Sequence, residues 1–343
     1  MNINNIENLE EEINKMNRFK PIIETIKNLY QNYKEIDSFI DCYNCQDDSE
    51  INHNKRTYSM DEVISAVLDF YKQLEPEYYM IVEKIFHEDK IRIYYKDSID
   101  PKRLSSARCN IYDDINPNEI EYLDPDSKLL YDCANYKIFV PLKRTIADFY
   151  SLTHELMHAI VWENTQHSKF SATTHMLVET PSRIVENLLD SYLIKQTNNK
   201  EEIIQCRLNR LLDTQRDIKY TYFADSLLKL NKTNGEYKLD NLKELLQQTN
   251  FVYSDAEISN FFGILKDKKY YLEGASRYIA GDIAALEFLN LFKEDRVIAT
   301  QRLKNLVQNI GNLTVEQSFA LIGVNLSGEP IKSVDKNTGN KSM

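Results

Sequence analysis

The chain has 343 residues, of which 42% are hydrophobic, and its formal net charge is −11 at pH 7. This length allows a sizeable core and roughly one to three domains. The acidic balance disfavours nucleic acid and anionic membranes as partners, because lysine and arginine dominate proteins that bind either, and no run of about 18 apolar residues predicts a membrane span.

The N-terminus and the cysteines bear on the cellular compartment. Residues 1–12 lack the succession of basic, apolar and small residues of a secretory signal peptide. Five cysteines, an odd number, fit reduced thiols in the cytosol, so we expect a cytoplasmic protein, with non-classical export as an effector left open. Cys42 and Cys45 have the spacing of half a zinc site or a redox pair, but no second pair follows, and we interpret them as loop thiols.

The first part of the chain has a helical pattern up to about residue 85. It includes residues 21–40 and a segment opened by the S-M-D-E run at 59–62. The former is charged enough to be a partner-binding arm, although a packed helical layer is the simpler interpretation. We therefore expect an N-terminal helical region over residues 1–88.

Candidate strands come next, at residues 90–95, 119–122 and 136–140, because these segments are rich in β-branched and aromatic residues. Together they predict a small sheet beside the helix that follows. That helix is expected to begin near Thr145, an N-cap residue with Asp148 three positions later. Its apolar residues cover a wide arc, which predicts a largely buried helix.

The same helix contains the most informative stretch of the chain, His154-Glu155-Leu156-Met157-His158. Positions i and i+4 stack one turn apart on a helix, so both histidines can ligate one metal ion, and Glu155 lies beside it as candidate general base. A catalytic zinc ion takes three protein ligands and leaves its fourth position to water. The alternative is a core helix whose histidines satisfy buried polar partners. The spacing favours a zinc hydrolase.

A third ligand must come from elsewhere in the chain. His167 and His175 are candidates, but Glu179 is the better one, because apolar residues between 184 and 189 predict a second buried helix that lays it against the first. Glu186 lies two turns further on the same face and can fix the tautomer of a ligating imidazole by accepting a hydrogen bond. The alternative for both carboxylates is a solvated helix face.

These residues resemble the zinc oligopeptidases of the thimet oligopeptidase and oligopeptidase F type, over about residues 100–292. In that family, T-L-x-D-x-x-x-L-x-H-E-x-G-H precedes a later E-x-P-S-x-x-x-E-N. Here residues 145–158 read T-I-A-D-F-Y-S-L-T-H-E-L-M-H, and residues 179–187 read E-T-P-S-R-I-V-E-N. Between them, F-S-A-T at 170–173 looks like the family's F-S-G-T.

The resemblance implies a ligand set and a mode of substrate binding. One zinc ion would be held by His154, His158 and Glu179, and Glu155 would activate its water. The strand at residues 138–140 would offer its backbone to an extended peptide as an added strand.

Tyrosines near the C-terminus also look like the family's tyrosine-rich segment ahead of a final helix. Peptide hydrolysis builds negative charge on the carbonyl oxygen, and preorganised donors stabilise it. No histidine occurs after His175 to do this. Tyr278 is the first candidate and Tyr271 the second, whereas packing is the alternative for both.

Three features depart from the family pattern. Met157 stands where the family usually has glycine, and the gap from His158 to Glu179 is somewhat shorter than in thimet-type members. The chain is also little more than half the usual length. These departures bear on the substrate range more than on the type of reaction.

Together these patterns predict a mostly α-helical protein (α+β with a small sheet beside the active-site helix) with a zincin-like metallopeptidase core. The expected catalytic domain covers residues 89–326, and the polar residues 327–343 are expected to be a disordered tail. The predicted function is that of a zinc metalloendopeptidase cleaving internal bonds of oligopeptides. A dedicated protease for one specific protein, such as a bacterial effector, and a non-catalytic zinc- or peptide-binding scaffold are the alternatives. The oligomeric state is left open.

Overall fold

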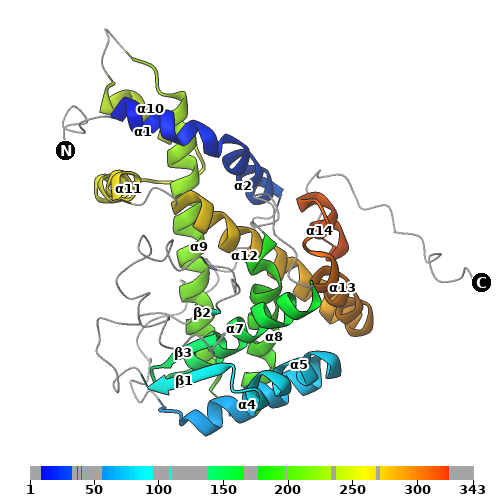
Figure 1. The fold of residues 1–343 in the computed structure, drawn as a ribbon. Coiled ribbons are helices and arrows are strands. Elements are labelled where there is room, and N and C mark those ends of the chain that lie inside the picture. Colours follow the sequence, from blue (N-terminus) through cyan, green and yellow to red (C-terminus); the bar gives the residue numbers. More distant parts are fainter. Residues whose placement is uncertain are drawn as a thin grey trace, which may run out of the picture.

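The structure is a computed structural model that describes residues 9–32, 37, 40, 56–95, 108–109, 138–165, 177–197, 199–232, 237–267 and 271–323. Helices dominate this part of the chain, and three short strands form a small sheet (Figure 1). The expected mostly helical fold with a small sheet is therefore confirmed. The expected strand at 119–122, the tail at 327–343, the Cys42/Cys45 pair and both His167 and His175 lie outside the described residues.

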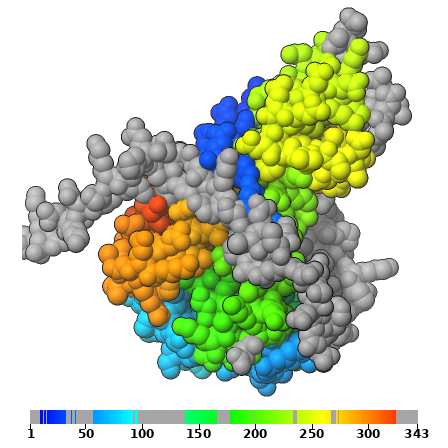
Figure 2. All heavy atoms as spheres, turned by 180° about the vertical axis from the view of Figure 1, so that it is seen from behind, coloured from blue at the N-terminus to red at the C-terminus, as the bar shows by residue number. Residues whose placement is uncertain are grey.

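Three N-terminal helices and three later ones meet at one end of the molecule, although the first part of the longest of them, residues 200–229, extends into the main core (Figure 1). Phe223, Phe261 and Phe262 pack together at the centre of the apolar core of this end, with ring centroids 5.1 and 5.4 Å from Phe223 to the other two. In Figure 2, α10 and α11 (yellow-green and yellow) stand out above the rest of the molecule. The six are α1 (Leu9–Met16), η2 (Asn17–Phe19), α2 (Lys20–Asn32), α9 (Lys200–Lys229), α10 (Leu239–Gln247) and α11 (Asp255–Asp267).

The sheet has the strand order β1-β3-β2 and consists of β1 (Ile91–Tyr95), β2 (Arg108–Cys109) and β3 (Ile138–Leu142). β1 runs parallel to all of β3, and β2 pairs antiparallel with Ile138 and Phe139. The expectation that residues 138–140 offer a free backbone is therefore wrong at Ile138 and Phe139, which have neighbours on both sides. β3 continues through Pro141 to Leu142, beyond the expected end of the strand at residue 140. Pro141 lies beyond the two residues of β3 that pair with β2. Its missing N–H group therefore costs no hydrogen bond with β2.

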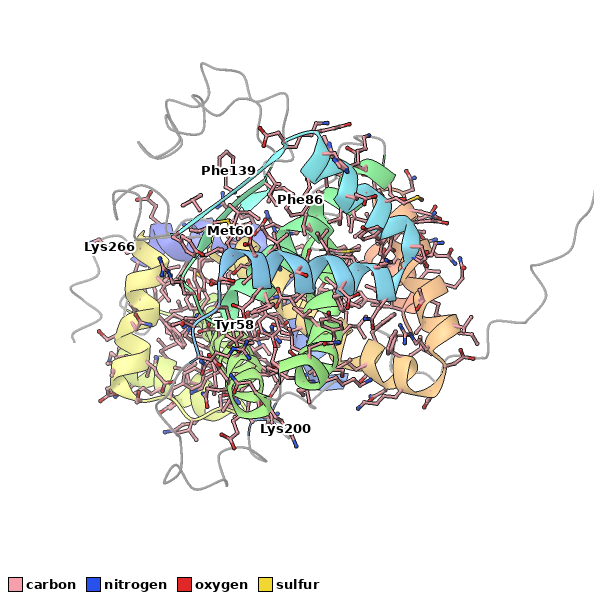
Figure 3. All side chains as sticks on the ribbon, turned by 90° about the horizontal axis from the view of Figure 1, so that it is seen from below. Tyr58, Met60, Phe86, Phe139, Lys200 and Lys266 are labelled. Atoms are coloured by element: carbon pink, nitrogen blue, oxygen red, sulfur yellow. The ribbon has the colours of Figure 1, made fainter. Side chains whose placement is uncertain are left out.

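Two helices cover one side of the core. Ser59 caps α4 (Met60–Leu74) through a capping box with Glu62, as the sequence predicts, and α5 (Pro76–His87) follows directly. Both pack against the motif helix. Figure 3 looks onto this side, with Met60 at the start of α4 and Phe86 near the end of α5.

The motif helix is α7 (Ala147–Asn164), and it is buried along most of its length. The prediction that Thr145 caps it is wrong, because the helix begins at Ala147 and no side chain caps it. Instead the Asp148 carboxylate accepts hydrogen bonds from the backbone N–H groups of Lys143 (2.9 Å) and Thr145 (3.0 Å). These bonds fix the turn from β3 into α7.

Two further helices pack against α7, namely α8 (Glu179–Thr197) and α13 (Arg296–Asn309). α8 also packs against α12 (Tyr271–Glu294), and α14 (Val315–Leu321) follows α13. Buried apolar side chains from before and after residue 88 in the sequence belong to one hydrophobic core. The domain boundary expected at residue 88 stays a prediction. Among the described helices, none is both long enough and apolar enough to cross a membrane.

Candidate metal centre

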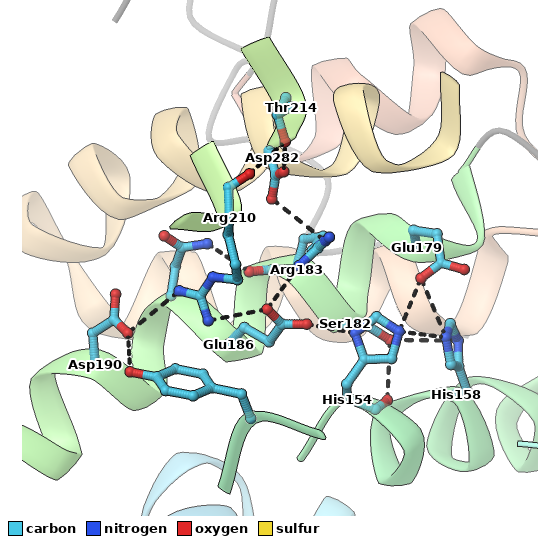
Figure 4. A network of polar contacts seen from close by, with 12 residues as sticks. His154, His158, Glu179, Ser182, Arg183, Glu186, Asp190, Arg210, Thr214 and Asp282 are labelled. Atoms are coloured by element: carbon cyan, nitrogen blue, oxygen red, sulfur yellow. Dashed lines mark hydrogen bonds and ion pairs between the residues drawn. The ribbon is translucent and has the colours of Figure 1, made fainter. Parts of the chain in front are cut away.

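Three of the expected ligands meet where α7 and α8 pack together. Nε2 of His154 lies 2.9 Å from Nε2 of His158 and 3.0 Å from Oε2 of Glu179, and the remaining pair is 3.3 Å apart (Figure 4). All three side chains are buried or nearly so. The α8 helix begins at Glu179, so its first turn supplies the carboxylate to the two histidines one turn apart on α7.

The spacing of these atoms fits a tetrahedral zinc ion. Ligands about 2.0–2.1 Å from zinc lie roughly 3.3 Å from one another in a tetrahedron. Oε2 of Glu179 is buried between the two imidazole nitrogens, 3.0 Å from Nε2 of His154 and 3.3 Å from Nε2 of His158. Two imidazole nitrogens and a carboxylate oxygen are also the donor set that borderline metals such as zinc prefer. The residues present therefore fit the metal that the sequence implies.

Hydrogen bonds on the far side of each ring set its tautomer. Nδ1 of His154 lies 2.5 Å from Oε1 of Glu186, and since a carboxylate only accepts, Nδ1 carries the proton. The Ser182 hydroxyl donates to the backbone oxygen of His154 (3.3 Å) and lies 3.4 Å from Nδ1 of His158, from which it can accept. Both Nε2 atoms therefore present lone pairs to Glu179.

Lone pairs and a carboxylate at this spacing repel one another unless a cation lies among them. A proton on Nε2 of His154 meets the same demand, and the pKa of His154 shows how strong the demand is. Burial lowers that pKa, but hydrogen bonds to Glu179 and Glu186 outweigh burial and raise it to about 10. Burial likewise raises the pKa of Glu179, yet its interactions with His158 and His154 hold that pKa well below its usual range. The centre favours a positive charge.

Glu155 lies beside this centre without joining it. Its side chain is 7% exposed, and it makes no hydrogen bond or ion pair within the described residues. Burial raises its pKa, while the nearby imidazoles of His154 and His158 partly offset this rise. A carboxylate with a raised pKa and no structural partner suits proton transfer.

A buried ionic network supports the centre from behind (Figure 4). Glu186 accepts from Nη1 of Arg183 (2.9 Å), and Nη1 of Arg210 on α9 lies 3.1 Å from the same carboxylate. These two cations hold the pKa of Glu186 below its usual value although burial raises it. Arg183 also meets Asp282 on α12, and Arg210 meets Asp190 on α8. Glu186 therefore stays ionised and oriented toward His154.

The two candidate tyrosines have different surroundings. Tyr278 is 37% exposed, and its ring lies over Arg183, with 4.7 Å from the guanidinium carbon to the ring centroid. Burial raises the pKa of its hydroxyl, and Glu179 and Glu155 are close enough to raise it further. The Tyr271 hydroxyl instead donates to Oδ1 of Asp217 on α9 (2.5 Å). The structure thus brings Tyr278, and not the Tyr271 hydroxyl, toward the three ligands.

Sequence reasoning did not identify most of the supporting residues. Arg183 lies inside the E-T-P-S-R-I-V-E-N segment, one helical turn from both Glu179 and Glu186. This spacing could have indicated an ion pair with one of the two carboxylates. Arg210 and Asp282 belong to helices distant in sequence, and no local pattern marks them. Met157, the departure from the family pattern, is fully buried in the core behind the centre.

No protein-family model and no curated protein matches the sequence. Solved structures do match in fold. A candidate peptidase from Chlamydophila abortus aligns with a TM-score of 0.54 and 16% identity over 90% of this chain and 51% of that chain. A candidate oligoendopeptidase F gives 0.57 and 14% over 89% and 55%. Another, from Bacillus anthracis strain Ames, gives 0.53 and 15% over 94% and 54%.

These matches show the fold. The chain shares the mostly helical fold of proteins named oligoendopeptidase F, as expected from the sequence. It spans about half the length of the structures that it matches.

Proposed function

We propose that the chain is a zinc-dependent metallopeptidase that hydrolyses internal peptide bonds of oligopeptides. The observation that carries this proposal is the meeting of His154, His158 and Glu179 donor atoms at 2.9–3.3 Å, with the uncommitted Glu155 carboxylate beside them. The shared fold with proteins named oligoendopeptidase F supports the same reaction class.

The residues divide the reaction among them. When bound by His154, His158 and Glu179, zinc supplies Lewis acidity, which lowers the pKa of water and polarises a carbonyl oxygen. Glu155 accepts the proton of the attacking water and then returns it to the leaving amine. Glu186 keeps the proton of His154 on Nδ1, so that Nε2 stays a ligand throughout.

Tyr278→Phe is expected to lower kcat about 100-fold, because the Tyr278 hydroxyl would donate to the oxygen on which negative charge develops. KM and zinc affinity should change little. Steady-state kinetics on a quenched-fluorescence peptide, together with a zinc titration, measure all three. Tyr271→Phe is the comparison, and a larger loss of kcat there than in Tyr278→Phe would transfer the role to Tyr271.

The pH profile is expected to report the environment of Glu155. Burial raises its pKa above the ordinary 4.5, and only the ionised form accepts a proton, so activity should fall as pH decreases through a midpoint above 4.5. The measurement is kcat/KM against pH, with zinc occupancy determined at each pH. A midpoint at or below the ordinary value, with zinc still bound, would contradict the assignment.

The test of the function is hydrolysis of a mixed-sequence quenched-fluorescence peptide library by the zinc-loaded chain, with a chelator as control. Cleavage that the chelator abolishes and added zinc restores would establish a metallopeptidase and give its site preference. Zinc bound at one ion per chain with no cleavage of any peptide would refute oligopeptide hydrolysis. That result would favour the two alternatives, a protease for one protein or a non-catalytic scaffold.

A further inference from the structure

Two buried guanidinium groups hold Glu186 in closely similar ways. Nη1 of Arg183 and Nη1 of Arg210 lie 2.9 and 3.1 Å from the same oxygen, Oε2 (Figure 4). Each guanidinium also meets an aspartate and the face of a tyrosine ring. For Arg210 these are Asp190, at 3.4 Å, and Tyr150, whose ring centroid is 4.4 Å away.

Arg183 has the corresponding partners on α12. Its Nε lies 3.4 Å from Oδ1 of Asp282, and its guanidinium carbon lies 4.7 Å from the centroid of the Tyr278 ring. Between them, a Cβ at Gly281 would come 2.8 Å from Cγ of Arg183 and 3.3 Å from the backbone oxygen of Glu179. Spacing of i, i+3 and i+4 places Tyr278, Gly281 and Asp282 on one face of α12, which forms a cradle for Arg183.

The two tyrosines differ in what their hydroxyl groups do. Tyr150 is 6% exposed, and its hydroxyl donates to Asp190 at 2.6 Å, so it completes an internal network. Tyr278 is 37% exposed, and its hydroxyl makes no hydrogen bond in the described part of the chain. The Arg183 guanidinium therefore fixes the Tyr278 ring, and the hydroxyl of that ring is available to form a hydrogen bond with a ligand.

We propose that Arg183 is a positioning residue that holds the Tyr278 ring and the Glu186 carboxylate at once. Through Glu186 it orients His154, and through the ring it fixes the side chain that carries the Tyr278 hydroxyl. This role deepens the proposed peptidase function and rests on it. Gly281 is the feature that lets α12 approach closely enough for both contacts.

The test compares Arg183→Lys with Arg210→Lys. Lysine keeps the positive charge but loses the planar guanidinium group that contacts several partners at once. Each variant therefore alters one contact to the same oxygen, Oε2 of Glu186. Of these two arginines, only Arg183 has a contact with Tyr278 in the described part of the chain. Both should therefore lower zinc affinity about 10-fold, because each weakens the contacts that orient Glu186, the hydrogen-bond partner of the ligand His154. Only Arg183→Lys should change the position of Tyr278.

The first readout does not depend on activity. The protein is labelled at the ζ carbon of tyrosine, and the Tyr278 signal is identified by its loss in Tyr278→Phe. We expect this signal to shift in Arg183→Lys and to stay unchanged in Arg210→Lys. An unchanged signal in Arg183→Lys, or an equal shift in both variants, would overturn the proposal. If the wild-type chain cleaved no peptide, the proposed function would fail and this readout would still decide the position of Tyr278.

The second readout is a double-mutant cycle on kcat. Tyr278→Phe should cost about 100-fold in the wild-type background but less than about 10-fold in Arg183→Lys, because the hydroxyl is already misplaced there. In the Arg210→Lys background it should keep its full cost. Additive losses in the Arg183 cycle would overturn the coupling.

Gly281→Ala tests the same contacts without altering any charged residue. Its methyl group would displace the Arg183 stem, which cannot move aside like the end of a flexible chain. The Tyr278 signal should shift as in Arg183→Lys, and zinc affinity should fall by a similar factor. A Gly281→Ala protein with wild-type values for both would show that the cradle does not set these contacts.

Discussion

Glu155→Gln is expected to keep zinc and lose turnover, with kcat falling about 100- to 10,000-fold, the usual contribution of a general base. Glutamine has nearly the same shape but cannot accept a proton at neutral pH. The donor atoms that fit zinc belong to His154, His158 and Glu179, so zinc affinity should change by less than a few-fold. Because burial penalises the charge of Glu155, thermal stability should stay equal or rise.

The measurement pairs steady-state hydrolysis of the peptide substrate with a zinc titration of the same protein sample. Glu163→Gln is a matched control, since Glu163 lies on the same helix and forms a solvent-accessible ion pair with Lys84 at 3.8 Å. It should leave both quantities unchanged. A Glu155→Gln enzyme that turns over normally would remove Glu155 from the mechanism, and one that loses zinc would make it a ligand instead.

The three ligand residues could be predicted from the sequence because their positions follow from the periodicity of one helix, or from the packing of two helices. His154 and His158 follow from the period of the helix alone. Glu179 needed a second step, the apolar pattern between residues 184 and 189 that predicts a buried helix. The structure brings these three together. Their role as metal ligands stays a prediction that the zinc titrations test.

What escaped prediction depends on contacts between elements far apart in sequence. Arg210 reaches Glu186 from α9, and Asp282 reaches Arg183 from α12, so neither has a neighbour in sequence that would mark it. The pairing of β2 with Ile138 and Phe139 was missed for the same reason. The error at Thr145 was local: Asp148 caps the turn through backbone N–H groups of residues before the helix, a pattern that competes with a threonine cap.

His154→Ala is expected to abolish the effect of zinc on stability as well as activity. The substitution removes one of three donor atoms and the partner of Glu186, so zinc affinity should fall by more than the roughly 100-fold that loss of an outer partner can cause. Binding to the native state alone stabilises it by about 2.7 kcal/mol when free zinc is at 100 times the Kd. With affinity reduced by that factor or more, the same zinc concentration should add less than about 0.5 kcal/mol.

Thermal unfolding with chelator, and again with added zinc, separates this effect from damage to the fold. His87→Ala is the matched control, because His87 is an exposed histidine at the end of α5 and should keep the full zinc-dependent rise in Tm. The chelated His154→Ala protein should unfold cooperatively, since Arg183 and Arg210 still neutralise Glu186. If zinc raised the Tm of His154→Ala as much as that of the wild type, the metal would bind at another site. The proposed reaction would then have to take place at that site.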